Sequence, residues 1–166
     1  MNNAFLLLGS NLGDRLSFLN LAITSLQKTA GEIKNLSSVY ETAAWGNTEQ
    51  QAFLNQVLEL ETSLLPEQLL AQIHHIEKAA GRVRTEHWGP RELDIDILFF
   101  GKLLVNMPNL AVPHPQLHLR RFTLLPLAEI APDLVHPTLH KSVSELLQIC
   151  PDTLEAHIYH HGKLDL

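Results

Sequence analysis

The chain begins with a short continuous run of apolar residues, then a turn, and then apolar residues at three-to-four spacing. This change from a strand-like pattern to a helix-like pattern constrains the fold more than any other feature. The run spans residues 4 to 8 and is closed by Gly9-Ser10-Asn11, which predicts a buried strand that ends in a turn. Asp14 can cap a following helix, whose apolar residues recur at three-to-four spacing until Gly31. The first unit is therefore a strand, a turn and a helix.

The same two periods recur further along the chain. Residues 33 to 42 are rich in strand-forming side chains and residues 53 to 64 alternate, so both segments predict strands. Pro66 opens a second helix that ends before Gly81, and residues 93 to 100 alternate again. This order predicts an α+β fold, a ferredoxin-like βαββαβ antiparallel sheet with helices packed on it.

The chain after Lys102 is richer in proline and changes character. Residues 103 to 106 predict a short strand, and residues 122 to 130 and 142 to 150 predict helices, so we expect a C-terminal helical extension. No internal repeat or interdomain linker is visible. We therefore expect a single domain over residues 1–166.

The composition limits the classes of partner. An apolar share of 45% supplies one hydrophobic core. The net charge of −6 argues against a protein that binds nucleic acid through its phosphates, because such a protein needs an excess of Lys and Arg. Cys150 is the only cysteine and the first apolar run is too short for a signal or a membrane span. We expect an untargeted cytoplasmic protein with no nucleic-acid or membrane partner.

The most informative pattern is Asp94-Ile95-Asp96-Ile97. Side chains two residues apart on a strand share a face, so both carboxylates stand side by side while the isoleucines enter the core. A divalent cation such as Mg²⁺ relieves the repulsion between two such carboxylates. The alternative for an isolated Asp-x-Asp is a solvated acidic pair on an exposed face.

Arginine is concentrated in one part of the chain. Five of the six arginines, Arg82, Arg84, Arg91, Arg120 and Arg121, lie between positions 82 and 121. Guanidinium groups bind phosphate oxygens in a bidentate way, so their position near the paired aspartates suggests a polyphosphate held between metal and arginine. Surface salt bridges with nearby glutamates are the simpler alternative.

Histidines give a second cluster. His114 lies between two prolines, which hold it in an extended or turn conformation with its ring available to a ligand. The pairs His114/His118 and His136/His140 also have a spacing that could supply zinc ligands, although no cysteine or His-Glu-x-x-His frame accompanies them. A structural turn histidine is the remaining alternative.

Aromatic residues come from three separate segments. Trp45, Phe53 and Phe122 could belong to the core, or with Thr42 and Asn55 they could enclose a flat heterocycle and hydrogen-bond its edge. The glycine-containing segment 9 to 13 lacks the spacing of a phosphate-binding loop, which favours a tight turn.

The sequence resembles the 6-hydroxymethyl-7,8-dihydropterin pyrophosphokinase family over nearly the whole chain, and three blocks carry the resemblance. They are Gly9-Ser10-Asn11-Leu12-Gly13, the segment 81 to 98 with Trp88-Gly89-Pro90-Arg91-Glu92-Leu93-Asp94-Ile95-Asp96, and the segment 112 to 122 with Val112-Pro113-His114-Pro115 and Arg120-Arg121-Phe122. The Trp-Gly-Pro-Arg turn before a Leu-Asp-x-Asp strand is the most specific of these.

The resemblance implies a monomeric enzyme that transfers diphosphate from ATP to the pterin and forms AMP. It implies two Mg²⁺ ions on Asp94 and Asp96, which with Arg82 and Arg91 form the catalytic set. It places ATP near a further group of residues: His74, Glu77, Arg84, Trp88, Ile97, His114, Arg120 and Arg121. The implied pterin pocket consists of Thr42, Ala43, Trp45, Phe53, Asn55 and Phe122.

Two other functions fit parts of the pattern. A ferredoxin-like module can bind a small effector without chemistry, in which case paired aspartates are not needed. A metal-dependent phosphohydrolase would use the same carboxylates and release phosphate from nucleotides without a pterin.

Overall fold

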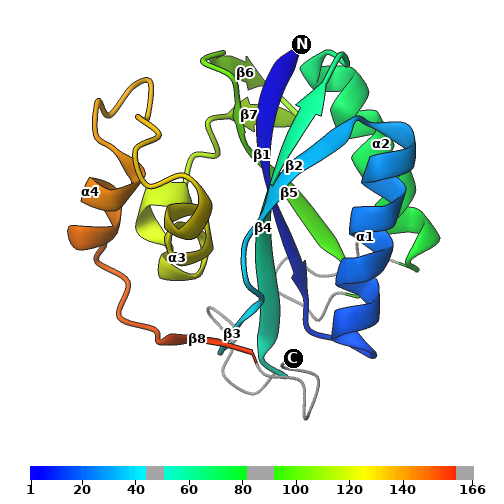
Figure 1. Ribbon diagram of the computed structural model, residues 1–166, viewed down its shortest axis with the longest axis horizontal. Coiled ribbons are helices and arrows are strands. Elements are labelled where there is room, and N and C mark those ends of the chain that lie inside the picture. Colours follow the sequence, from blue (N-terminus) through cyan, green and yellow to red (C-terminus); the bar gives the residue numbers. More distant parts are fainter. Residues whose placement is uncertain (44–50, 82–91, 160–166) are drawn as a thin grey trace.

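A twisted antiparallel sheet forms the centre of the computed structural model, which describes residues 1–43, 51–81 and 92–159 (Figure 1). The strand order is β5-β1-β4-β3-β8, and β2 also pairs with β4. All of the pairings are antiparallel. The strands are β1 (Asn2–Ser10), β2 (Glu32–Leu36), β3 (Tyr40–Thr42), β4 (Phe53–Thr62), β5 (Asp94–Phe100) and β8 (Ala156–Ile158).

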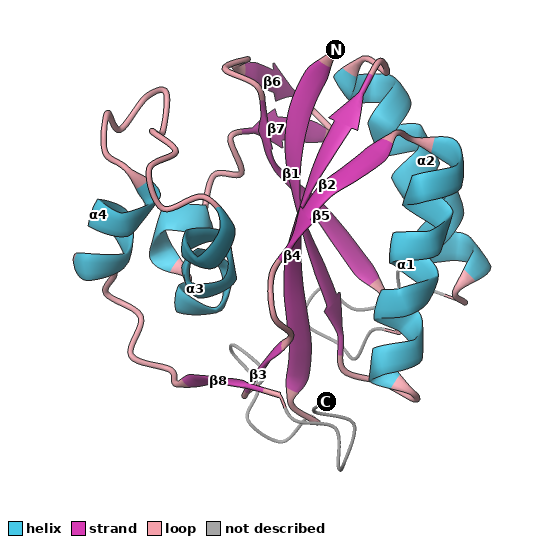
Figure 2. Cartoon of the chain, in the orientation of Figure 1, coloured by secondary structure: helices cyan, strands magenta, loops and turns pink. Residues whose placement is uncertain are grey.

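Helices cover both faces of the sheet, as Figure 2 shows. The pair α1 (Arg15–Thr29) and α2 (Pro66–Ala79) packs on one face, and the pair α3 (Arg121–Ile130) and α4 (Val143–Gln148) packs on the other. Each pair encloses its own hydrophobic core. The mixed helix and antiparallel sheet agrees with the fold class expected from the sequence.

The first apolar run is continuous because β1 is buried on both faces. Leu6 and Leu8 belong to the core under α1 and α2, whereas Phe5 and Leu7 belong to the core under α3 and α4. A strand that alternated with polar residues would place uncompensated polar groups in one of these cores.

The strand expected over residues 33 to 42 is interrupted, which corrects the prediction from sequence. Ser37 lies between β2 and β3, and its backbone N–H donates to the Val57 carbonyl at 2.9 Å. The Ser37 hydroxyl accepts from the Val57 N–H at 2.9 Å, and the Ser37 carbonyl accepts from the Gln56 amide at 2.8 Å. The side chain thus takes over part of the strand pairing, and the strand divides in two.

The segment after β5 differs from the expectation in detail. The short strand expected at 103 to 106 begins two residues later as β6 (Val105–Met107), because Leu103 closes a turn by donating its N–H to the Phe100 carbonyl at 3.0 Å. It pairs with β7 (Leu110–Val112), and a short 3-10 helix, Leu117–Leu119, follows. Both C-terminal helices form where they were expected, and β8 was not foreseen.

Ser142 explains where α4 begins. Its hydroxyl accepts from the Glu145 N–H at 3.1 Å, and the Glu145 carboxylate accepts from the Ser142 N–H at 2.9 Å. This reciprocal capping pairs two N–H groups that the helix itself leaves unbonded. Within the described ranges, the helices are too short or too polar to cross a membrane.

Candidate active site

A cavity of about 480 Å³ lies where β1 and β3 end and where β4 and β5 begin. This volume is within the range of small-molecule sites. Twelve residues that the sequence singled out line it together: Thr42, Ala43, Phe53, Asn55, His74, Glu77, Asp94, Asp96, Ile97, His114, Arg120 and Phe122.

Asp94 and Asp96 stand on one face of β5, as the alternation predicted. Both are half-buried and line the cavity, whereas the intervening Ile95 and the following Ile97 are only 4% exposed. Two carboxylates in this arrangement provide oxygen ligands for Mg²⁺, whose remaining positions are commonly filled by water and substrate phosphates. The donor set therefore fits the metal that the family resemblance implies.

The outer edge of β5 is closed by α2. Glu77 is only 3% exposed, and its carboxylate accepts a hydrogen bond from the Ile95 N–H at 2.9 Å. Because β5 is the last strand on this side of the sheet formed by the described residues, that N–H has no strand partner beyond it among them. Glu77 thus fixes the backbone between the two aspartates, and His74, one turn earlier on α2, also lines the cavity.

His114 is held next to the aspartates by backbone contacts. Its N–H donates to the Leu98 carbonyl at 3.0 Å, and its Nδ1 accepts from the Gln116 N–H at 3.2 Å. Burial and, to a smaller extent, the charge of Arg120 lower the pKa of His114 to about 4, although Asp94 opposes this shift. The ring is therefore neutral near pH 7, and because Nδ1 accepts, the ring proton is on Nε2.

Arg120 supplies the cation of the described cavity lining. Its Nη2 donates to the Gln116 side-chain oxygen at 2.7 Å, and its guanidinium carbon lies 5.6 Å from the centre of the Phe122 ring. Burial lowers the pKa of Arg120, while the charges of Asp96, Asp94 and Asp152 oppose that shift. A guanidinium stays protonated under these conditions, so a positive charge faces the carboxylate pair.

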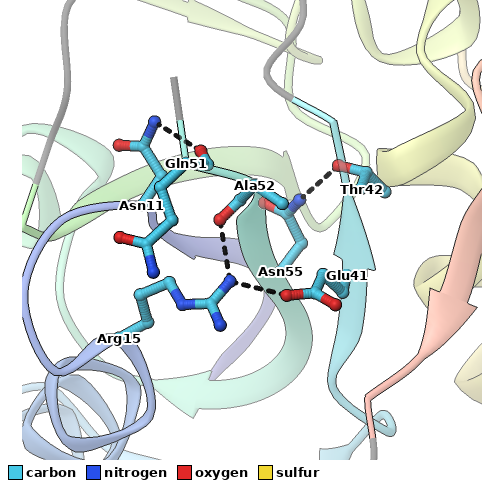
Figure 3. Close-up of polar contacts among 7 residues, drawn as sticks. All are labelled: Asn11, Arg15, Glu41, Thr42, Gln51, Ala52 and Asn55. Carbon is cyan, nitrogen blue, oxygen red and sulfur yellow. Dashed lines mark hydrogen bonds and ion pairs between the residues drawn. The ribbon is translucent and has the colours of Figure 1, made fainter. Parts of the chain in front are cut away.

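The opposite end of the cavity is lined by buried polar groups and aromatic rings. Asn55 and Thr42 are 3% and 4% exposed, and the Asn55 amide points to the Thr42 hydroxyl at 3.5 Å (Figure 3). Phe53 and Phe122 also line the cavity, and Phe122 is the ring next to Arg120. Amide groups flanked by rings suit a flat heterocycle with hydrogen-bonding edges.

Several residues singled out by the sequence are not in this lining. Arg121 does not line the cavity; it begins α3, and its backbone N–H donates to the Asp152 carboxylate at 3.0 Å. Five others lie outside the described residues: Trp45, Arg82, Arg84, Trp88 and Arg91.

One wall of the cavity was missed by the sequence analysis. It is formed by the β6–β7 hairpin, from Met107 to Ala111, together with Leu70 of α2. The sequence carries one signal for this hairpin, the Pro108-Asn109 pair between two short strand-forming stretches.

The zinc hypothesis gains no support in the described part of the chain. No group of three or more His, Cys, Asp or Glu side chains within the described ranges is arranged to hold a metal ion. The rings of His118 and His136 meet, with centres 6.5 Å apart, and both residues line a second cavity together with His114, which also lines the cavity that holds the aspartates.

Paired carboxylates that share a cavity with an arginine are an arrangement that suits phosphoryl transfer with a divalent cation. The family model described as 7,8-dihydro-6-hydroxymethylpterin-pyrophosphokinase (HPPK) matches residues 5–132. The chain belongs to this family.

Two relatives carry the name 2-amino-4-hydroxy-6-hydroxymethyldihydropteridine pyrophosphokinase. The protein of Aquifex aeolicus is 46% identical over 145 residues, which is 87% of this chain and 90% of that protein. The protein of Bacillus subtilis is 46% identical over 132 residues, 78% of this chain and 79% of that protein.

A solved structure shows the same fold at lower identity. The crystal structure of wild-type Plasmodium falciparum HPPK-DHPS superposes with a TM-score of 0.73 at 18% identity. The match covers 89% of this chain but 44% of the Plasmodium chain, so this chain spans less than half of that protein.

Proposed function

We propose that the cavity is the place where this chain carries out the reaction of its family, the transfer of diphosphate from ATP to 6-hydroxymethyl-7,8-dihydropterin in folate synthesis. The hydroxymethyl oxygen attacks the β-phosphorus of ATP and a new O–P bond forms. The bond between the β-phosphorus and the α,β-bridging oxygen breaks, AMP leaves with that oxygen, and the hydroxyl proton passes to solvent.

The order of the strands suggests how the ligands lie. The pterin occupies the end near β3 and β4, where Asn55 and Thr42 face its edge and Phe53 and Phe122 cover its ring. The adenosine lies beyond β5, against α2 and the β6–β7 hairpin. The phosphates then lie over β5 and Asp94, between the two other ligand groups.

The described residues can perform most of the work of binding and alignment. Asp94 and Asp96 would hold Mg²⁺, which would neutralise phosphate charge and bind the transferred group when present. Arg120 places a fixed positive charge beside the phosphates, and the neutral His114 offers its Nε2–H to a phosphate oxygen. Phosphoryl transfer depends mainly on such alignment and charge neutralisation.

The observation that carries this proposal is that one cavity is lined by a carboxylate pair, an arginine, a buried amide and two aromatic rings. The test is product analysis with ATP and Mg²⁺, with and without 6-hydroxymethyl-7,8-dihydropterin. We expect AMP and the pterin diphosphate in equal amounts, and only when the pterin is present.

The same assay separates the other candidate functions. ADP or phosphate release that does not need the pterin would indicate a phosphohydrolase. Ligand binding with no AMP would indicate an effector-binding module. Either result would contradict the proposed reaction.

We propose two Mg²⁺ ions, both held by Asp94 and Asp96, and a monomer that acts as a single domain in the cytoplasm. We also propose the ferredoxin-like βαββαβ class, which the strand order β5-β1-β4-β3 supports. The site residues outside the described ranges, Arg82, Arg84, Arg91, Trp88 and Trp45, keep the roles that the family resemblance implies.

A further inference from the structure

Arg15 links two strands from the side of the sheet opposite the cavity. Its Nη1 donates to the Glu41 carboxylate at 2.7 Å and to the Ala52 carbonyl at 2.9 Å (Figure 3). Glu41 is the middle residue of β3, so its side chain points away from the face that carries Thr42. One guanidinium nitrogen therefore connects β3 with the residue that precedes β4.

Both contacts lie directly next to cavity-lining residues. Glu41 precedes Thr42 and Ala52 precedes Phe53, and Thr42 and Phe53 are register partners in the β3–β4 pair. Both partners line the pterin end of the cavity. Arg15 thus contacts the residue before each of these two side chains, through the Glu41 carboxylate on β3 and through the Ala52 backbone carbonyl next to β4.

Arg15 is more enclosed than the cation of an ordinary surface ion pair, while its Glu41 partner is 39% exposed. The Arg15 side chain is 14% exposed, and its guanidinium carbon lies 5.6 Å from the centre of the Tyr159 ring. Tyr159 is itself tied to the sheet, because its N–H donates to the Val39 carbonyl at 2.7 Å. By contrast, the side chain of Lys34, which pairs with Glu61 elsewhere on the sheet, is 42% exposed.

We propose that Arg15 is a positioning residue for the pterin substrate, acting through Glu41 and Ala52 on the spacing of Thr42 and Phe53. The proposal rests on the proposed function of the cavity. It assigns no contact between Arg15 and either substrate. We expect the effect to be limited to the pterin, because the two aspartates, His114 and the cavity residues of α2 and the β6–β7 hairpin belong to elements other than β3 and β4.

The test compares the KM values of the two substrates in variants of Arg15. Arg15→Met removes both hydrogen bonds and keeps much of the side-chain volume. We expect the KM for the pterin to rise about tenfold, because small misplacements of binding groups have effects of this order or larger. The KM for ATP should stay within about twofold, and Arg15→Lys, which keeps the charge, should restore part of the pterin affinity.

Lys34→Met is the matched control, because it removes a cation of the same sheet that contacts no residue next to the cavity. It should change neither KM. A loss of thermal stability in Arg15→Met with both KM values unchanged, or an equal rise of both KM values, would overturn the proposal. Such results would mean that Arg15 has a general structural role.

Glu41→Gln keeps the test possible if Arg15→Met does not fold. It preserves the shape of the contact and removes the negative charge, so we expect the pterin KM to rise about threefold. An unchanged pterin KM in Glu41→Gln would also contradict the proposal. Wild-type protein that forms no pterin-dependent AMP in the same assay would instead refute the proposed function, on which this inference depends.

Discussion

Asp94 and Asn55 lie in one row of the sheet, separated by the glycine at position 9, which is the register partner of both residues. The row crosses three adjacent strands, β5, β1 and β4. It connects the carboxylate of Asp94 with the amide of Asn55 along the cavity. Because Gly9 has no side chain, the floor of the cavity between these groups is backbone alone.

We predict that Gly9→Ala weakens pterin binding while the fold is kept. A Cβ atom at this position would lie 3.0 Å from the Asn55 side-chain oxygen and 3.7 Å from a Phe53 ring carbon. Asn55 would have to move by a few tenths of an ångström, and overpacking of this kind costs roughly 1 kcal/mol or more. Steady-state kinetics should show a pterin KM about fivefold higher, and an unchanged value would show that the row tolerates a side chain.

Two variants of Glu77 test whether this side chain has a structural role or binds the nucleotide. Glu77→Gln keeps an oxygen that can accept from the Ile95 N–H, whereas Glu77→Leu leaves that buried N–H without this acceptor. The loss should lower the free energy of unfolding by about 1–3 kcal/mol in the leucine variant. Denaturant unfolding of both variants measures it. If Glu77→Leu instead keeps full stability and Glu77→Gln loses ATP affinity, the carboxylate contacts the nucleotide.

His114 should make the protein less stable in mild acid. Its pKa is about 4 in the folded chain against 6.5 as the ordinary value, mainly because of burial. Between these values the unfolded chain binds a proton that the folded chain does not, so stability falls as the pH decreases through this interval. His114→Gln removes the group, and its free energy of unfolding should decrease less than that of the wild type between pH 7 and pH 5.

An NMR titration checks the same assignment directly. The His114 ring should remain neutral, with its proton on Nε2, down to below pH 5 in the absence of metal and nucleotide. A midpoint near 6.5 would contradict the assignment.

Tyr40 of β3 and Glu129 of α3 connect this helix to the sheet. Tyr40 is the register partner of Asn55, which lines the cavity. The Tyr40 hydroxyl donates to Glu129 at 2.7 Å, and Ser38 donates to the same carboxylate through its N–H and its hydroxyl. Tyr40→Phe should therefore cost about 1.5–3 kcal/mol of unfolding free energy, the range for hydrogen bonds to charged groups. Ser17→Ala, whose side chain is remote from this contact, serves as the comparison in chemical denaturation.

The same contact gives a prediction at high pH. Burial, with the hydrogen bond and the charge of Glu129, raises the pKa of Tyr40 from 10.0 to about 12. A raised pKa means that this stabilisation is complete below pH 10 and is lost as the pH rises toward 12. Ultraviolet titration of the phenolate should give a midpoint well above 10 for Tyr40, and a midpoint at 10 would mean that the contact is absent in solution.

The positions that follow from local period were predictable from the sequence. Asp94 and Asp96 face the cavity and Ile95 is buried because strand alternation alone determines which side each residue takes. The helix at Pro66 and the capped helix after Ser142 follow from local rules in the same way.

The positions that depend on distant partners were not predictable. Ser37 breaks a strand through bonds to Val57, a residue far away in sequence. The β6–β7 hairpin becomes a cavity wall only after it packs beside β5. Arg120 and Arg121 are adjacent and chemically identical, yet the start of α3 directs only Arg120 into the cavity lining.

The central claim is that the aspartates of β5 serve diphosphate transfer, and removing them tests it most directly. Pterin-dependent AMP formation should be measured in the wild type, in Asp94→Ala/Asp96→Ala and in the exposed control Asp133→Ala. We predict that the double variant loses at least about a thousandfold in rate while it remains folded, and that Asp133→Ala equals the wild type. A folded double variant that still forms AMP at a rate near that of the wild type would contradict the account.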